Sequence, residues 1–388
     1  MKRIPAERLT GPVKLKGFKK APTITTYQEW RTFINRPVIE RPVLPERKVW
    51  KAWSDEQRKQ FNRTRHEYHA GFPPIATPEL DHFHDQMLLQ IWKNLDGDDG
   101  ACPGGLLDGL GTLGKTTILK SLGKRFEKEF NDTYPPEDPE QQDLVIPVAF
   151  VSMSAKATPK DLSLRLARYY NLPLPRSTKG VTKIDVTSAV VECAKIHCTQ
   201  VIMVDDAHLI NIHTDQGQLA NDHFKDLMTE TGATFVFAGI NCRSLLSEGL
   251  ANSRQSQLAG RMIYQRIDPM RQDAEAWTGV LTELEKLLVL GNIPAGALSV
   301  NFHDYLYHRT GGSIGSLMNL IRKATRVAVD TGGEAITEQL LEGIEIDSNA
   351  ELERVRQQAQ AQQVRPGRPV RTRRTIKIPN TAEAEVTP

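Results

Sequence analysis

The segment from Gly109 to Thr117 constrains the fold of this chain more than any other. It reads Gly-Leu-Gly-Thr-Leu-Gly-Lys-Thr-Thr and fits the pattern G-x-x-x-x-G-K-[ST] at every fixed position. Glycines in this pattern let backbone N–H groups turn toward phosphate oxygens, which a Cβ atom would obstruct. The lysine reaches the β- and γ-phosphates, and the hydroxyl that follows it ligates Mg²⁺. The segment therefore predicts a loop that binds a nucleoside triphosphate.

The sequence on both sides of the loop supports this interpretation. A short apolar run at 105–108 predicts a buried strand, and apolar residues at helical spacing predict a helix from Thr116 to about Phe130. The amino end of that helix would face the anion. A glycine-rich turn without a ligand does not account for this order of strand, loop and helix. The expected phosphate contacts are Gly109, Gly111, Thr112, Leu113, Gly114, Lys115, Thr116 and Thr117.

Composition bounds the class of protein. The chain has 388 residues, enough for two domains, and 39% hydrophobic and 25% charged residues are typical of a soluble globular protein. No apolar run approaches the roughly 20 residues of a membrane-spanning helix, and no secretory signal opens the chain. The 4 cysteines form no C-x-x-C pair, which favours plain thiols in a reducing cytoplasm. We therefore expect a cytoplasmic protein without a membrane partner.

The small net charge of +3 conceals an uneven distribution. Residues 1–20 contain seven Lys and Arg against one Glu, and residues 354–377 contain eight with no acidic residue. The remaining chain is therefore acidic. Basic arms of this kind suit nucleic acid or an acidic partner, and they are equally compatible with solvated tails that bind nothing.

Apolar strands and helices alternate along the middle of the chain. Strands are expected at 145–151, 200–204 and 234–238, and helices at 159–170, 188–197 and 223–231. Continuous apolar strands separated by helices predict a parallel sheet covered on both faces, an α/β fold of three layers. Beyond Pro269 the pattern predicts only helices, at 274–289, 299–308, 313–330 and 337–343.

These patterns divide the chain into four regions. They are a basic, proline-rich N-terminal extension (1–53), a nucleotide-binding core that begins with two helices (54–268), a helical lid (269–346) and a basic low-complexity tail (347–388). The tail is poor in apolar residues, and its end is expected to be disordered.

Two acidic residues follow the strand at 200–204. Asp205 stands where ligands of parallel sheets gather, so we assign it, with Thr116, to Mg²⁺. Asp206 occupies the position at which a glutamate often polarises the attacking water. Its side chain is one methylene shorter, so the backbone lies closer, a water bridges, or hydrolysis is slow. His208 is expected to be a surface or structural histidine rather than a catalytic one.

Two further residues complete the expected site. Asn241 follows the next strand and can orient water at the γ-phosphate; capping of the strand end is the alternative. Arg261 is the candidate that stabilises charge on the transferred phosphoryl group, often from a neighbouring subunit. A surface role is the alternative for Arg261, and Arg254 and Arg266 are its nearby competitors.

The order of phosphate loop, Asp-Asp strand, polar strand, arginine and helical lid resembles an AAA+ ATPase. Four short motifs resemble those of one branch of these ATPases, the TniB-like transposition regulators, which are related to TnsC and the Mu B protein. The motifs are Tyr68-His69 before 75–78, then 204–208, 237–240 and 257–261. The resemblance covers about residues 54–345.

This resemblance implies a bacterial, nucleoid-associated ATPase that uses ATP and Mg²⁺. It implies ATP-dependent oligomerisation on double-stranded DNA as a ring or helical filament, contact with a DDE transposase and sometimes a target-selection protein, and action of Arg261 across a subunit interface. Two departures suggest a slow switch rather than a fast motor: Asp206 replaces glutamate, and 312–315 lacks the arginine that many AAA+ lids carry.

The DNA-contacting residues are the least constrained. Lys156, Lys160 and Lys179 lie where related ATPases carry an inner-face insertion, although surface lysines without a ligand would look the same. Two other functions remain as alternatives, a STAND-like signalling or defence NTPase and an initiator-type replication loader. Both usually bring a further domain, and the pattern of this chain favours neither.

Overall fold

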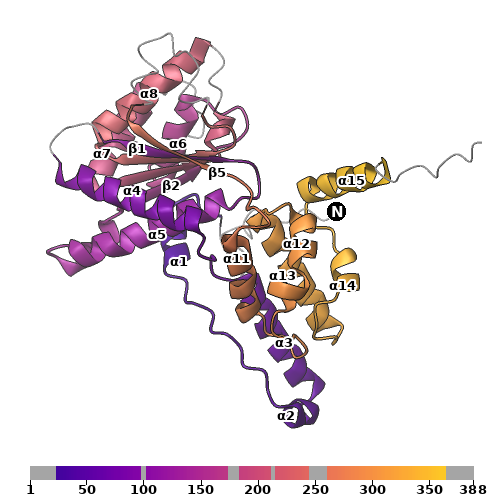
Figure 1. Cartoon of the computed structure of the whole chain (residues 1–388). Helices are drawn as coiled ribbons and strands as arrows, with labels where there is room; N and C mark the ends of the chain where they lie inside the picture. The colour runs from indigo at the N-terminus through magenta and orange to yellow at the C-terminus, as the bar shows by residue number, and fades with distance from the viewer. Residues whose placement is uncertain (1–22, 98–101, 174–182, 211–214, 244–259, 364–388) are drawn as a thin grey trace, which may run out of the picture.

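The computed structural model describes residues 23–97, 102–173, 183–210, 215–243 and 260–363, and Lys179 and Arg254 lie outside these ranges. The described chain has two hydrophobic clusters, one around a sheet and one among the helices that follow it. Figure 1 shows the two as neighbouring lobes, the sheet with its helices in one and the lid helices in the other.

The core is built on five parallel strands in the order β2-β3-β4-β1-β5. Their bounds are β1 Gly104–Gly109, β2 Val148–Ser152, β3 Val201–Asp205, β4 Thr234–Gly239 and β5 Met262–Ile267. Strands β1, β3 and β4 are buried along their whole length, as a sheet covered on both faces requires. The predicted three-layer α/β fold is therefore confirmed.

Strand β5 was not anticipated from the sequence. It pairs only with β1 and forms an edge of the sheet, and most of its residues are half-buried. An edge strand buries one side only, so Met262 to Ile267 mix apolar and polar side chains and lack the continuous apolar run of the central strands.

Helices cover the two faces of the sheet separately (Figure 1). One face carries α1 (Tyr27–Ile34), α4 (Pro78–Asp96) and α5 (Lys115–Thr133). The other carries α6 (Pro159–Tyr169), α7 (Lys183–Ile196) and α8 (Asp215–Thr231). Helices α7 and α8 begin earlier than the apolar periodicity indicated. Short 3₁₀ turns, η2 (Pro139–Leu144) and η3 (Ala207–Leu209), precede β2 and follow β3.

Helix α1 of the N-terminal extension is part of the core. Trp30 is 1% exposed, stacks on Phe150 at 5.7 Å between ring centroids, and donates its indole N–H to Glu127 Oε2 at 2.6 Å. Burial raises the pKa of Glu127 to about 7, while the bond from Trp30 acts in the opposite direction. The extension therefore docks on the sheet through one aromatic anchor.

The lid combines helices from two parts of the chain. Its bounds are α11 Glu275–Leu287, a π-helical turn η4 Ala297–Asn301, α12 His303–Thr310, α13 Ile314–Asp330 and α14 Glu338–Glu342. Helices α2 (Arg47–Ala52) and α3 (Asp55–Ala70) lie beside them in Figure 1, and α3 packs on α13. Arg65 of α3 is buried and donates to both carboxylate oxygens of Glu334, at 2.7 and 2.8 Å. The assignment of α3 to the nucleotide-binding core is therefore corrected, since its apolar residues belong to the lid.

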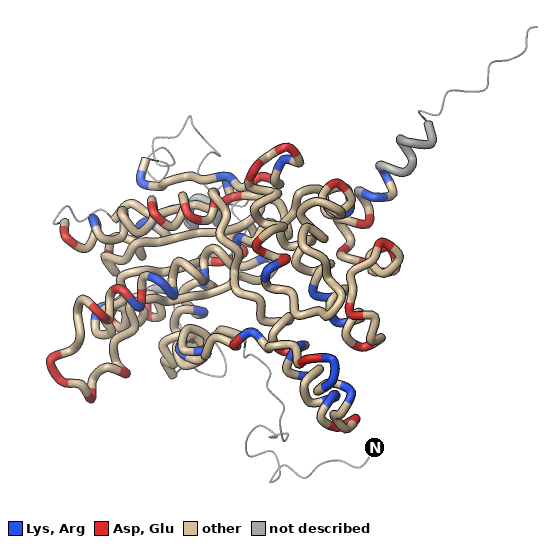
Figure 2. Tube along the Cα trace, turned by 60° about the horizontal axis from the view of Figure 1, so that its bottom comes forward, with Lys and Arg blue, Asp and Glu red and all other residues tan. Residues whose placement is uncertain are grey.

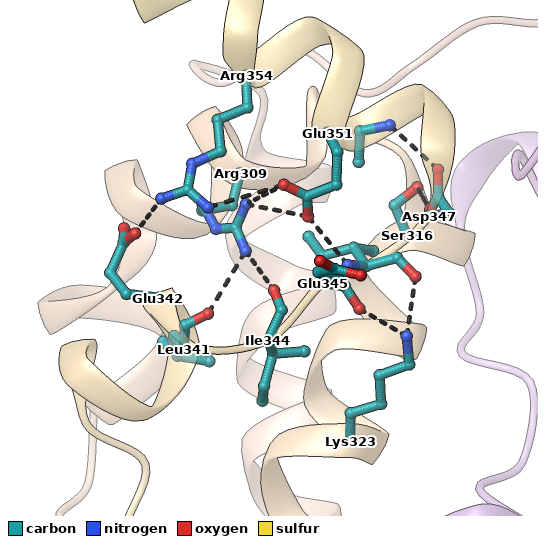
Figure 3. A network of polar contacts seen from close by, with 12 residues as sticks. Arg309, Ser316, Lys323, Leu341, Glu342, Ile344, Glu345, Asp347, Glu351 and Arg354 are labelled. Carbon is teal, nitrogen blue, oxygen red and sulfur yellow. Dashed lines mark hydrogen bonds and ion pairs between the residues drawn. The ribbon is translucent and has the colours of Figure 1, made fainter.

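The region interpreted as a low-complexity tail begins with a helix, α15 (Ser348–Gln363). Figure 3 shows what holds it: Arg309 pairs with Glu351 at 3.4 Å, and Arg354 pairs with Glu342. Lys323 donates to the carbonyls of residues 345 and 346 just before the helix. Ion pairs rather than apolar residues anchor α15, so hydropathy alone did not reveal it. Within the described residues, no helix is both long and apolar enough to cross a membrane.

Candidate nucleotide site

The phosphate loop joins the end of β1 to the start of α5 and lies at the carboxyl edge of the sheet. Gly114 stands just before α5 with φ 85°, and Thr112 has φ 62°. Glycine tolerates this left-handed conformation at no steric cost, whereas Thr112 is strained unless its surroundings hold it. The loop and the amino end of a 19-residue helix together provide the backbone N–H groups that bind phosphate.

Lys115 turns its side chain back over the loop. Its Nζ donates to the carbonyl of Gly109 at 2.8 Å and to that of Leu110. Burial lowers the pKa of Lys115, and the charge of Asp205 acts in the opposite direction. Carbonyl oxygens are weaker partners for an ammonium than phosphate oxygens, so an incoming polyphosphate can replace them.

Thr116 and Asp205 form an oxygen pair that fits Mg²⁺. The Thr116 hydroxyl donates to Asp205 Oδ2 at 2.7 Å, and the backbone N–H of Asp206 donates to Asp205 Oδ1 at 3.0 Å. Burial raises the pKa of Asp205, while the bond from Thr116 opposes the shift. Hydroxyl and carboxylate oxygens are hard donors that suit this cation. Bound there, Mg²⁺ would neutralise charge on the β- and γ-phosphates.

Asp206 is held by a residue that the sequence analysis did not identify. Its φ is 55°, and its Oδ2 accepts a hydrogen bond from the Ser152 hydroxyl at 3.1 Å. Ser152 ends β2 opposite Asp205 in the register of the sheet. A carboxylate has about four lone-pair sites, so the bond from Ser152 orients Asp206 and leaves sites that can take a proton from water. A polar residue at the end of a strand is the sequence feature that could have identified Ser152.

Asn241 and Arg261 lie at opposite ends of the strands: Asn241 at the carboxyl ends and Arg261 at the amino ends. Asn241 follows β4, between the ends of β1 and β3, with φ 52°. Arg261 precedes β5, where its carbonyl accepts the N–H of Gly104 at 2.7 Å, at the beginning of β1. At about 3.3 Å per residue, the length of β1 separates Arg261 from the phosphate loop by about 16 Å. An arginine side chain does not span that distance, so Arg261 does not reach the phosphates of its own subunit.

The carboxylate of Asp108, the residue before the phosphate loop, accepts three hydrogen bonds. It is 5% exposed, and its Oδ1 accepts the N–H of Gly109 at 2.8 Å and that of Cys242 at 3.1 Å. Its Oδ2 accepts the phenol of Tyr264 at 3.1 Å. These donors offset the cost of a buried charge and turn it away from the phosphate side of the loop.

The lid contacts the phosphate loop directly. The carbonyl of Thr112 accepts the N–H of Gly315 and the hydroxyl of Ser313, both at 2.8 Å. Ser316 donates to Asp347 Oδ2 at 2.7 Å, which joins α13 to the beginning of α15. The lid thus meets the loop through hydroxyls and backbone in the segment that lacks an arginine.

A pocket opens beside this contact. It lies between the start of α4, the phosphate loop, the end of β5 and the lid. Its lining is mainly apolar and consists of Thr77, Glu79, Leu113, Ile118, Ile267, Asp268, Met270, Gly312 and Ile314.

We expect Gly315→Ala to weaken nucleotide binding. An alanine Cβ would lie 2.3 Å from the Thr112 carbonyl oxygen, so the lid must shift away from the loop and from the pocket. Overpacking of this kind costs about 1–3 kcal/mol, which corresponds to about tenfold or more in Kd. Titration with a fluorescent ADP measures it. Gly279→Ala in α11 is the matched control, because a Cβ there meets nothing within 4 Å, and equal affinities for both variants would contradict the role of this contact.

Two of the three lysines proposed to contact DNA lie within the described residues. Lys156 is exposed and has φ 61°, Lys160 is half-buried and takes part in a further interaction, and Lys179 lies outside the described residues. Figure 2 shows a group of Lys and Arg positions along α2 and α3. Its exposed members are Arg47, Lys48, Lys51, Lys59 and Arg63.

A family model described as an AAA domain matches residues 101–245. No curated protein sequence matches the chain. Among solved structures, Cdc6p from Pyrobaculum aerophilum is similar with a TM-score of 0.52 and 17% identity, over 72% of this chain and 73% of that one. The ORC2 protein of Aeropyrum pernix, solved as ADPNP–ADP complexes, gives 0.53 and 13% over 75% and 72%. The ORC1 protein of Aeropyrum pernix, in complex with DNA, gives 0.50 and 16% over 83% and 69%. The chain therefore has an AAA+ P-loop fold with an AAA-type ATPase domain.

Proposed function

We propose that this chain is an ATP-dependent, oligomerising DNA-binding regulator of DNA transposition, which selects target DNA and activates a DDE transposase. One observation carries the oligomeric part. The phosphate loop and Arg261 lie at opposite edges of one sheet, where β1 pairs with β5. When subunits stack head to tail, the side of one subunit that carries Arg261 faces the phosphate loop of the next. Heterologous contacts of this kind build rings or helical filaments.

In this function each residue at the phosphate edge has one task. Lys115 and the loop N–H groups bind the β- and γ-phosphates, and Thr116 with Asp205 would hold Mg²⁺. Asp206 acts as base for the attacking water, and Asn241 orients that water. The side chain of Asp206, one methylene shorter than glutamate, favours slow turnover. Slow hydrolysis suits a switch that remains assembled while ATP is bound.

The transposition part rests on the sequence motifs. Of these, Tyr68 and His69 are buried in the lid, and His69 accepts the N–H of Val289 at 3.1 Å. Burial lowers the pKa of His69 to about 4, so it is a neutral acceptor. This part of the motif serves the docking of α3 and not the chemistry.

An initiator-type replication loader is the second candidate. The similarity of fold to Cdc6p and the two ORC proteins favours it. Both candidates assemble on DNA with ATP, and they differ in the protein that is recruited.

Electron microscopy of negatively stained protein with duplex DNA tests the shared part. With a slowly hydrolysed ATP analogue we expect rings or filaments on the DNA, and with ADP we expect fewer. Lys115→Ala is the control that should not assemble. Isolated monomers at saturating analogue and DNA would exclude the proposal. Co-sedimentation of the assembled protein with a purified DDE transposase or with a replicative helicase then separates the two candidates.

We expect Lys156→Glu with Lys160→Glu to weaken duplex binding. Each lost phosphate contact lowers the slope of log K against log salt by about 1, so the pair should lower it by about 2. Lys48→Glu with Lys51→Glu makes the same change of charge on α2 and is the control. Fluorescence anisotropy over a salt series measures both slopes. An unchanged slope for the first pair and a reduced one for the second would move the DNA surface to α2 and α3.

A further inference from the structure

Asp108 places a negative charge one residue before a loop built to bind polyphosphate. Nothing in the phosphate-loop pattern requires it, and a carboxylate near phosphate opposes binding unless other groups stabilise it. Its side chain is 5% exposed and has three donors around it. An acceptor that takes two N–H groups and a phenol at once is most readily a carboxylate, which offers about four lone-pair sites and donates nothing. The residue type is therefore explained by its contacts rather than by the ligand.

One oxygen of this carboxylate holds two parts of the site together. Oδ1 accepts the N–H of Gly109, whose carbonyl in turn accepts Lys115 Nζ. The same Oδ1 accepts the N–H of Cys242, the residue directly after Asn241. This oxygen therefore links the phosphate loop to the segment that carries Asn241.

The surroundings make this connection stiff. Cys242 is 0% exposed, and a Cβ on Gly239 would lie 2.3 Å from its sulfur, so the chain turns back tightly after β4. Gly239 is also the neighbour of Asp108 in the sheet. With Gly239 in the strand and Cys242 anchored by both side chain and N–H, Asn241 is presented from a short, fixed turn with φ 52°.

We propose that Asp108 is a positioning residue that couples the phosphate loop to Asn241, so that filling the loop with phosphate aligns Asn241 for hydrolysis. This inference rests on the proposed ATPase function. The carboxylate is engaged by three protein donors. Its removal should therefore lower kcat far more than it lowers nucleotide affinity.

Three variants separate geometry from charge. Asp108→Asn keeps an oxygen that accepts both N–H groups and an amide that donates to the Tyr264 oxygen, but it removes the charge. Asp108→Ala removes every bond. Tyr264→Phe removes only the outer bond at Oδ2 and leaves Oδ1 with both N–H donors.

Steady-state ATP hydrolysis and titration with fluorescent ADP, both with the full chain and duplex DNA, provide the readouts. For Asp108→Ala we expect kcat to fall on the order of 10²-fold, the cost of misplacing a catalytic group by about 1 Å. Its Kd for ADP should change by less than about tenfold. Asp108→Asn and Tyr264→Phe should stay close to wild type in kcat, and this rescue by the isosteric variant is what a purely structural role would not require.

Two results would overturn the inference. One is an alanine variant that hydrolyses ATP at the wild-type rate. The other is a parallel loss of kcat, ADP affinity and melting temperature, which indicates damage to the fold alone. If the alanine variant does not fold, Asp108→Ser replaces it, since the shorter hydroxyl does not reach all three donors. A wild-type protein without any hydrolysis would instead refute the proposed function itself.

Discussion

The Lys115→Ala variant is expected to lose nucleotide binding and, with it, assembly on DNA. Lys115 is the buried cation of the loop, and among the described residues its Nζ donates to two backbone carbonyls, which phosphate can replace. Hydrogen bonds to charged groups contribute about 1.5–3 kcal/mol each, so loss of the ammonium should weaken binding on the order of 10²-fold or more. Isothermal titration with ATP and Mg²⁺ measures the affinity, and sedimentation with DNA measures assembly.

Circular dichroism separates this effect from unfolding. The folded chain loses only the bonds from Lys115 to two carbonyls, so the melting temperature without nucleotide should change little. Lys124→Ala, at an exposed position further along α5, is a matched control for loss of a lysine from the same helix. Unchanged assembly of Lys115→Ala would show that the loop from Gly109 to Thr117 does not control oligomerisation.

The Arg261→Ala variant is expected to retain nucleotide binding and lose hydrolysis. Arg261 lies beyond reach of its own phosphate loop, so its removal leaves the contacts with bound nucleotide intact. An arginine supplied by a neighbouring subunit contributes about 10³–10⁵ in kcat. Arg266→Ala is the matched control, because Arg266 lies in β5, the strand that follows Arg261, is exposed and pairs with Asp268. Loss of turnover in the control alone would transfer the role to Arg266.

A mixing experiment tests whether the site is shared. Asp206→Ala subunits lack the base but keep Arg261, and Arg261→Ala subunits keep the base. Neither should hydrolyse ATP alone. In a mixed oligomer, a phosphate loop from an Arg261→Ala subunit can face Arg261 of an Asp206→Ala subunit, so part of the activity should return. An equimolar mixture that stays inactive while it assembles would argue against a site built from two subunits.

The sheet was largely predictable because its central strands are buried on both faces. Continuous apolar runs such as 201–204 have few alternatives to a parallel sheet. Edge elements were not predictable in the same way. Strand β5 mixes polar and apolar residues because it buries one side, and α15 is anchored by Arg309 and Arg354 rather than by an apolar face.

The sequence could not show which lobe α3 packs against, for a related reason. Its amphipathic pattern shows that one face is buried but not which partner covers that face. The buried pair of Arg65 with Glu334 joins residues 269 positions apart, and no local pattern records such a contact.

The sequence could indicate that Gly109 to Thr117, Asp205 and Asn241 lie at the same ends of the strands, because local patterns identify the loop and the strand ends. The loop pattern specifies backbone turns and reach within a few residues, and parallel strands bring their carboxyl ends together. The separation of Arg261 from that edge, the bond from Ser152 to Asp206 and the shared oxygen of Asp108 depend on strand order and register. Those are set by packing of the whole core, which is why only the tertiary structure distinguishes a site completed by a neighbour from one complete in a single chain.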